Sequence, residues 1–217
     1  MASIEFDGRS YSLAEGETVL DALLRNGAEV AHSCKAGSCG SCMLRAVEGS
    51  VPPRAQLGLK ESWKAQGYVL ACVCRPESDL KLAPVGADAQ SGATITGLSL
   101  LSGDVMQVLL QCDAAMAFRA GQYVTVIREG GVSRSYSIAS LPHEGDIELH
   151  VRRIAGGRMS GWLHEEAKVG DRVALMGPLG DCFYVPGREE QPLLLVGTGT
   201  GLAPLYGILR DALEHRH

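Results

Sequence analysis

The 217-residue sequence has no long apolar run, no basic excess and no apolar leader. Its longest apolar stretch, residues 192–201, is short and broken by glycine, whereas a helix that spans a bilayer needs about 18 apolar residues. Residues 1–10 lack the apolar segment of a signal peptide. The net charge of -5 argues against a nucleic-acid binder, which usually carries a basic patch. We therefore expect a cytoplasmic protein with no membrane and no nucleic-acid partner.

A disulfide framework is not expected, because the cysteines are odd in number and clustered, a pattern more typical of a metal site. They are Cys34, Cys39, Cys42, Cys72, Cys74, Cys112 and Cys182. Because metal-binding thiolates survive in a reducing compartment, we expect the protein to function in one. Hydrophobic residues make up 46% and charged residues 21%, and the length suits two small domains better than three.

The first elements are predicted from turn and cap signals. Asp7-Gly8 separates two short strands, Ser3–Phe6 and Arg9–Leu13, as a two-residue hairpin turn. Thr18 is expected to be the N-cap of a short helix that ends at Gly27. A hairpin followed by a helix is typical of the start of a β-grasp domain.

Many short strands follow, and their spacing predicts a small antiparallel barrel in the second half of the chain. We expect strands at Met43–Val47, Tyr68–Val73, Thr94–Leu101, Val105–Cys112, Tyr123–Arg128, Ser133–Ala139, Asp146–Ile154 and Arg172–Met176, with a helix at Met159–Ala167. Small and polar residues at Pro84–Gly92 predict a linker. Leu193–Val196 is a continuous apolar run, which predicts a buried parallel strand, and a helical pattern covers Leu202–His215.

The cysteine spacing is Cys34-x4-Cys39-x2-Cys42, with Cys72 further along the chain. Gly37 and Gly40 let this loop bend so that backbone N–H groups can point at the sulfurs. The spacing resembles that of plant-type ferredoxins, and the resemblance implies a [2Fe-2S] cluster held by these four thiolates.

Two alternatives remain at this point. A zinc site is the other metal reading, although zinc usually binds two short Cys-x2–4-Cys pairs. Cys74 is the runner-up for the fourth ligand, because it would share a face with Cys72 if the segment stayed a strand. Cys112 and Cys182 are expected to be ordinary small hydrophobic residues of the barrel.

Residues 133–140 read SRSYSIAS, and the core Arg134-Ser135-Tyr136-Ser137 resembles a signature of the ferredoxin–NADP reductase superfamily. The resemblance implies that the arginine meets a flavin phosphate, the tyrosine packs on the isoalloxazine and a Ser hydroxyl lies near N5. His150-Val151-Arg152 and a glycine turn that opens a helix follow in the order expected there. That turn implies a pyrophosphate site at Gly157, Arg158, Met159 and Ser160. FAD is favoured over FMN.

Residues 196–204 read VGTGTGLAP, which resembles the start of the NAD(P) domain of the same superfamily. The resemblance implies a nicotinamide-nucleotide site at Gly197, Thr198, Gly199, Thr200 and Gly201, with Thr200 also at the flavin. Since such domains continue for several strands and helices, we expect a fragment of a longer reductase.

The whole order resembles the ferredoxin-FAD-NAD reductases of bacterial multicomponent oxygenases. We expect an α+β multidomain fold with a β-grasp ferredoxin domain (1–86), an antiparallel Greek-key FAD-binding barrel (92–188) and the truncated start of an α/β nucleotide-binding domain (191–217). A nicotinamide gives two electrons and a cluster takes one, so a flavin must lie between them. The resemblance implies NAD(P)H-dependent reduction of an oxygenase or similar protein acceptor, with no side chain acting as a decisive acid or base.

The electron acceptor stays open, because related modules also serve deoxysugar synthesis. One alternative is an electron-relay module without its own nicotinamide reaction, fed by a partner protein. A gene that extends past His217 would favour the enzyme, and a true stop there would favour the relay. A zinc-stabilised β-grasp adaptor is a third reading.

Overall fold

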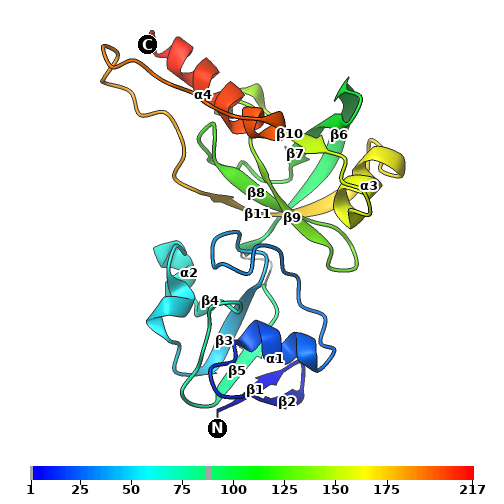
Figure 1. Ribbon diagram of the computed structural model, residues 1–217, viewed down its shortest axis with the longest axis vertical. Coiled ribbons are helices and arrows are strands. Elements are labelled where there is room, and N and C mark those ends of the chain that lie inside the picture. The colour runs from blue at the N-terminus through cyan, green and yellow to red at the C-terminus, as the bar shows by residue number, and fades with distance from the viewer. Residues whose placement is uncertain (1, 87–88) are drawn as a thin grey trace. The chain divides into compact units, whose positions relative to one another are not determined.

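A computed structural model describes residues 2–86 and 89–217, which form two compact units, Met1–Gln90 and Ser91–His217. The two units are coloured from blue to cyan and from green to red in Figure 1. Residues 87–88 of the predicted linker lie outside the described residues. The rest of that stretch is partly ordered, because Ala89 is buried and the first strand of the second unit begins at Ser91.

The first unit begins with the predicted hairpin and helix. Strands β1 (Ser3–Phe6) and β2 (Arg9–Ser12) pair antiparallel across Asp7-Gly8, whose backbone φ angles of 51° and 71° are those of a tight turn. Helix α1 (Val19–Arg25) starts where the Thr18 hydroxyl accepts the backbone N–H of Asp21. The hairpin and the helix start are confirmed.

These strands belong to a five-stranded sheet of order β2-β1-β5-β3-β4, in which β1 and β5 run parallel. Its other members are β3 (Met43–Gly49), β4 (Tyr68–Leu70) and β5 (Leu80–Ala83). The sequence reading missed β5, the 3-10 helix η1 (Pro53–Gln56) and helix α2 (Glu61–Ala65). All three are short, so they carry little periodic signal.

The second unit contains a six-stranded antiparallel sheet of order β10-β7-β6-β11-β8-β9. Its strands are β6 (Ser91–Ser102), β7 (Val105–Cys112), β8 (Tyr123–Ile127), β9 (Ser133–Ser137), β10 (Ile147–Arg152) and β11 (Arg172–Leu179). The expected strands are confirmed within a few residues. Their alternating apolar side chains form one core around residues such as Val124, Leu149 and Leu175.

The expected barrel is not a closed one. Edge strands β9 and β10 do not pair along their length, and a single bridge joins Ile138 to Leu149. A hydrogen bond from the Ala139 N–H to the Glu148 carbonyl, 2.9 Å long, continues that contact. The sheet therefore curls until its edges touch at one place.

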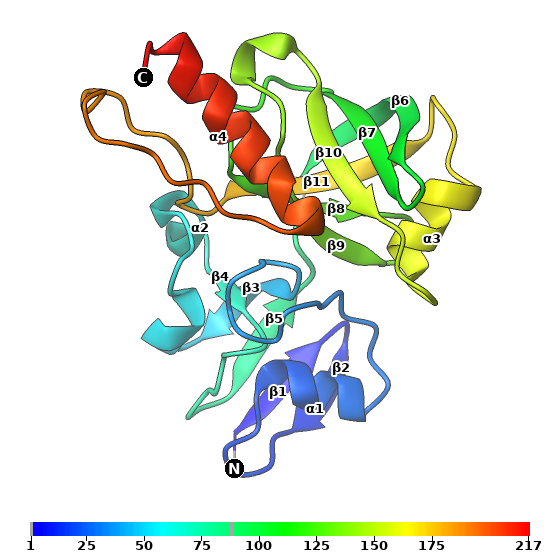
Figure 2. The same cartoon turned by 45° about the horizontal axis from the view of Figure 1, so that its top comes forward.

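Helices flank this sheet. The 3-10 helix η3 (Pro142–Glu144) precedes β10, α3 (Arg158–Glu165) follows it, and the 3-10 helix η4 (Gly199–Gly201) leads into α4 (Leu202–Glu214). Figure 2 shows α4 lying alongside β10. None of the helices in the described ranges has the length and apolar character needed to cross a membrane.

The prediction of a buried strand at Leu193–Val196 is wrong for this structure. No strand forms there, and Leu194 and Val196 are 87% and 77% exposed. A parallel strand obtains its hydrogen bonds and its burial from neighbouring strands and from helices on both faces. Among the described residues no strand pairs with this run, so it stays extended.

Candidate functional site

The loop before β3 gathers hydrogen-bond donors around the Cys34 sulfur. The backbone N–H groups of Ala36 and Cys39 donate to this sulfur at 3.3 and 3.4 Å. The Ser38 hydroxyl donates to it at 3.4 Å. Burial raises the pKa of Cys34, but these hydrogen bonds outweigh it and bring the pKa down to about 6. The loop is therefore built to stabilise a thiolate.

Cys72 joins the same neighbourhood from the turn after β4. Its sulfur is hydrogen-bonded to Cys42 and accepts the backbone N–H of Gly37, and the first of these contacts lowers its pKa to about 7. Gly37 has a φ of +76°, and a Cβ there would lie 3.2 Å from the Val73 side chain. Glycine is needed at this position because the backbone turns left-handed against a neighbouring side chain.

Cys74 lies apart from this group. The segment does not stay a strand, because β4 ends at Leu70 and the Val73 N–H closes a turn on the Leu70 carbonyl at 3.1 Å. The Cys74 side chain is fully buried, and burial alone raises its pKa to about 12. The turn thus separates the two candidates for the fourth ligand that the sequence left open.

The donor set expected from the sequence consists of cysteine sulfurs. Within the residues that the structure describes, no three His, Cys, Asp or Glu side chains are arranged to hold one metal ion. A [2Fe-2S] cluster takes four thiolates over two irons. The hydrogen bonds that reach the sulfurs of Cys34 and Cys72 fit the chemistry of such ligands.

The other two cysteines lie elsewhere. Cys112 ends β7 and is half-buried, as expected for a small apolar residue. Cys182 is exposed in the segment after β11, so the prediction that it packs in the barrel is wrong. Cys182 lies just after β11, where the chain leaves the sheet. No sequence pattern indicates which residues of that segment face solvent.

A second candidate site is a cavity of about 310 Å³ in the second unit. Strand β9, strand β10, the start of α3 and the turn before α4 contribute to its lining. The lining residues are Arg134, Ser135, Tyr136, His150, Arg152, Ile154, Gly157, Arg158, Met159, Ser160 and Thr200. Most of the cofactor-binding residues expected from the sequence are therefore brought together, although they come from four separate segments.

Two predicted residues, Ser137 and Val151, do not line this cavity. Ser137 is half-buried on β9, and the Val151 side chain is fully buried in the core of the unit. Ile154 lines the cavity and was not predicted. An exposed isoleucine after a strand carries no signal of its own, because single exposed apolar residues are common.

The cavity is cationic. Among the described residues, Arg134 and Arg158 have no carboxylate within ion-pair distance, whereas Arg152 is paired with Asp104 at 2.8 Å. Gly157 is the N-cap of α3 and no side chain caps that end, so the first N–H groups of the helix are available to an anion. Burial raises the pKa of Tyr136 to about 12, which keeps its ring neutral. An apolar ring beside free cations suits an aromatic ligand that carries phosphate.

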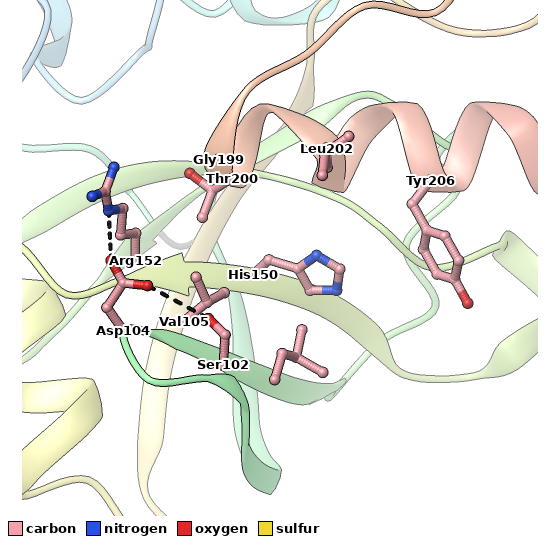
Figure 3. Close-up of a pocket in the computed structure, with 10 residues that line it drawn as sticks. Ser102, Asp104, Val105, His150, Arg152, Gly199, Thr200, Leu202 and Tyr206 are labelled. Atoms are coloured by element: carbon pink, nitrogen blue, oxygen red, sulfur yellow. Dashed lines mark hydrogen bonds and ion pairs between the residues drawn. The ribbon is translucent and has the colours of Figure 1, made fainter.

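A larger cavity, of about 530 Å³, adjoins the first one and shares His150, Arg152 and Thr200 with it. Figure 3 shows its walls: β10 below, the turn before β7 on one side and the first turns of α4 above. The lining residues not shared with the first cavity are Leu101, Ser102, Asp104, Val105, Gly199, Leu202 and Tyr206. Of these residues, only Gly199 was predicted from the sequence to belong to a binding site.

The predicted nucleotide-binding turn contributes to both cavities in part. Thr200 lines both and Gly199 lines the larger one, whereas Gly197, Thr198 and Gly201 line neither. The turn closes through a hydrogen bond of 3.0 Å from the Gly201 N–H to the Thr198 carbonyl. The turn therefore lies at the junction of the two cavities.

Comparison with known proteins identifies two domain families in the chain. Residues 4–77 match the family described as a 2Fe-2S iron-sulfur cluster binding domain. Residues 93–184 match the oxidoreductase FAD-binding domain family.

Curated relatives match along almost the whole chain. The chain is 39% identical over 235 residues to the reductase subunit of an aromatic O-demethylase from an Amycolatopsis species, covering 99% of this chain and 68% of that protein. It is 39% identical over 217 residues to the toluate 1,2-dioxygenase electron transfer component of Pseudomonas putida, covering 92% of this chain and 62% of that protein. The chain thus spans roughly two thirds of the length of these relatives.

Solved structures give the same result. A cytochrome P450 reductase from Amycolatopsis superposes with a TM-score of 0.58 at 37% identity, over 99% of this chain and 69% of that one. The ferredoxin reductase of carbazole 1,9a-dioxygenase gives a TM-score of 0.59 at 30% identity, over 99% of this chain and 71% of that one. With an iron-sulfur domain followed by an FAD-binding domain, the chain belongs to the family of reductase components of oxygenase systems.

Proposed function

We propose that this chain passes electrons from NAD(P)H through FAD to a [2Fe-2S] cluster and on to a protein acceptor. The observation that carries the proposal is the cationic cavity in which Arg134, Tyr136 and Arg158 meet the turn at Thr200. A phosphate-bearing ring cofactor fits that combination of charge and aromatic surface. The relatives are reductase components that serve oxygenases, which supports an oxygenase component as the acceptor.

The first unit would hold the cluster through Cys34, Cys39, Cys42 and Cys72. The hydrogen bonds to the Cys34 sulfur and the contact of Cys72 with Cys42 support this set. Backbone N–H groups aimed at sulfur stabilise the added charge when a cluster is reduced. The isolation of Cys74 argues against it as a ligand.

The second unit would hold FAD, which when bound accepts two electrons as hydride and releases them singly. Arg134, Arg158 and the start of α3 would bind its phosphates, and Tyr136 would cover its ring. The remaining members of the proposed cofactor set are Ser135, Ser137, His150, Val151, Arg152, Gly157, Met159, Ser160 and Thr200. The work of these residues is to bind and orient the cofactor.

The nicotinamide nucleotide would approach at Gly197, Thr198, Gly199, Thr200 and Gly201. Two of these line the larger cavity, which lies directly beside the proposed flavin cavity. That adjacency supports the proposal, because hydride transfer requires the two rings in contact.

The finer architecture belongs to the same proposal. Residues 1–86 would be a β-grasp ferredoxin domain, 92–188 a Greek-key FAD-binding barrel and 191–217 the first part of a nucleotide-binding domain. The free thiols of the described residues support a reducing compartment such as the cytoplasm.

A visible absorption spectrum of anaerobically purified protein tests the proposal, recorded before and after addition of NADH and NADPH. Flavin and iron-sulfur bands that bleach with a nicotinamide nucleotide support the whole sequence of electron transfer. Bands that bleach only with dithionite contradict the nicotinamide step and favour a relay fed by a partner. If protein supplied with iron and FAD showed neither band, the result would contradict both the flavin site and the cluster site.

Arg134 provides a sharper test of the flavin site. The variant Arg134→Ala removes a charged hydrogen-bond donor, so FAD affinity should fall roughly tenfold to a hundredfold, which corresponds to about 1.5–3 kcal/mol. Arg188→Ala, at an exposed position away from both cavities, is the matched control. Equal FAD affinity in the two variants, measured by fluorescence titration, would remove Arg134 from the site.

A further inference from the structure

His150 lies on β10 where the two cavities of the second unit adjoin, and it lines both of them. Figure 3 shows its imidazole between the strand and the first turns of α4, with one ring nitrogen turned toward the helix. The His150 and Glu148 side chains are each 14% exposed. The imidazole is therefore shielded from bulk water but open to whatever occupies the cavities.

The ring is held in one orientation by the residue two positions earlier. The Nε2 atom of His150 lies 2.8 Å from Oε1 of Glu148, and the Gln107 amide donates to the same oxygen at 2.7 Å. A carboxylate only accepts hydrogen bonds, so Nε2 carries the hydrogen and Nδ1 of the neutral ring is left as a proton acceptor. Among the described residues, Nδ1 of His150 has no hydrogen-bond partner.

The other titratable groups that line the smaller cavity are unsuited to take up a proton. Arg134, Arg152 and Arg158 stay protonated at any working pH. Burial raises the pKa of Tyr136 to about 12, so its hydroxyl keeps its proton. Imidazole is the side chain that changes charge near neutral pH. Of the described residues that line the smaller cavity, His150 alone offers a ring nitrogen with a free lone pair.

Charges from every neighbouring element act on the ring. Glu148 and Arg152 lie on β10 itself, and Asp104 in the turn before β7 pairs with Arg152.

Helix α4 contributes Tyr206, whose ring centre is 6.2 Å from that of His150. It also contributes Arg210, which pairs with Glu144 of η3. Arg134 of β9 and Arg158 of α3 also line the smaller cavity. Because Arg152 and Arg210 are both paired with other carboxylates, Glu148 is the charged group in direct contact with the ring.

We propose that His150 accepts the proton that reduced flavin releases as its electrons pass to the cluster, with Glu148 as the positioning residue. This inference rests on the proposed function. A hydride brings two electrons and one proton, whereas the cluster takes electrons alone, so one proton must leave for every two electrons passed on. The N–H bond of the reduced flavin breaks, a bond to Nδ1 forms, and the electrons go to the cluster. The imidazolium then releases its proton to solvent. The proposal departs from the expectation that no side chain acts as a base.

The test uses the whole chain loaded with FAD and cluster and reduced electrochemically. Stopped-flow mixing with excess cytochrome c, an artificial acceptor, follows flavin reoxidation by absorbance. We expect His150→Gln to slow reoxidation by about tenfold to a hundredfold at pH 7, as loss of a general base does. On protein saturated with FAD, the variant should also abolish the part of the pH dependence of the rate that the imidazole imposes. His143→Gln, a matched change at an exposed position outside both cavities, should leave the rate unchanged.

Glu148→Gln tests the positioning role without removing the imidazole. An amide at this position can donate as well as accept, so the hydrogen is no longer fixed on Nε2 and the dependence of the rate on pH should change. A second measurement follows the proton itself with a pH-indicator dye during a single reoxidation. In the wild type, release of the proton to solvent should lag behind loss of the reduced flavin, because the proton first binds to the imidazole, whereas His150→Gln should show no such lag.

Two results would overturn the inference: a wild-type rate, pH profile and timing of proton release in His150→Gln, or an unchanged pH profile in Glu148→Gln. The Glu148→Gln variant keeps the inference testable even if His150→Gln fails to bind FAD. Wild-type protein that binds no FAD would instead contradict the proposed function, so the two failures are distinguishable.

Discussion

At the scale of single residues, Cys72 and Cys74 show how two cysteines so close in sequence acquire different chemistry. The turn after β4 places the Cys72 sulfur against Cys42 and the Gly37 N–H. Cys74 is fully buried, and burial raises its pKa to about 12. A thiol in that environment stays protonated and inert.

We expect Cys72→Ala to lose the visible and EPR signals of the cluster, because a [2Fe-2S] cluster needs four protein ligands. Cys74→Ala should keep them and lose about 1 kcal/mol of stability, as small core truncations do. Iron content per chain and the EPR spectrum of the reduced protein measure both. Loss of the signals in Cys74→Ala with retention in Cys72→Ala would reverse the assignment.

At the scale of elements, the docking of α4 on the sheet depends on a small residue. A Cβ at Gly207 would lie 3.1 Å from the Ala139 carbonyl oxygen and 3.2 Å from the Ala120 side chain. These neighbours belong to backbone and to a short side chain, so they have little freedom to move. Gly161 in α3 differs, because a Cβ there meets nothing within 4 Å.

The same substitution should therefore have opposite effects in the two helices. Gly161→Ala should stabilise the protein by about 0.5–1 kcal/mol, since it removes the entropic cost of glycine in a helix. Gly207→Ala should destabilise it, because overpacking costs about 1–3 kcal/mol and outweighs the helix propensity gained. Urea unfolding of both variants measures the difference. A stabilised Gly207→Ala would show that α4 can shift without loss.

An ion pair between η3 and α4 makes this docking dependent on pH. The Arg210 guanidinium beside Glu144 holds the pKa of that carboxyl below its usual value. Because the folded pKa is depressed, the stabilisation is fully present above the unfolded pKa of about 4.3 and is lost as pH falls through the folded value.

Thermal unfolding of the wild type should therefore show a loss of stability below about pH 4.5 that is smaller in Glu144→Gln. The pair is partly exposed, so the difference should be modest and should shrink in high salt. A Glu61→Gln variant, whose partner Lys64 lies in the same exposed helix, is a suitable control. An equal acid response in Glu144→Gln and wild type would mean that the pair contributes nothing to the docking.

At the scale of the whole molecule, the two compact units each carry one proposed cofactor site. A ligand that binds one folded unit stabilises that unit by mass action, by about 2.7 kcal/mol at a hundredfold excess over its Kd. Calorimetry should therefore show that FAD raises the melting transition of the unit Ser91–His217. Removal of iron with a chelator should lower only that of Met1–Gln90. A single transition that responds equally to both treatments would show that the units unfold together.

The sequence by itself determined those features that depend on local geometry. The Asp7-Gly8 turn, the Thr18 cap and nearly all strands of the second unit were predictable, because turn chemistry, capping and alternation act over a few residues. The ordered motifs predicted which residues would line the smaller cavity, since every residue of Arg134 to Tyr136 and of Gly157 to Ser160 does so. The sequence did not predict β5 and α2, because elements this short contain too few residues to show a periodic pattern.

Only the tertiary structure decided what depends on long-range contacts. The turn at Ala71–Val73 separated Cys72 from Cys74. Since no strand among the described residues pairs with the run Leu193–Val196, Leu194 and Val196 are exposed. The larger cavity joins the turn before β7, strand β10 and helix α4, so no local pattern could predict Asp104 or Tyr206 in its wall. For the same reason, the sequence alone could not single out the pair of Glu148 and His150. The cavities beside the imidazole are lined by residues that lie far apart in the sequence.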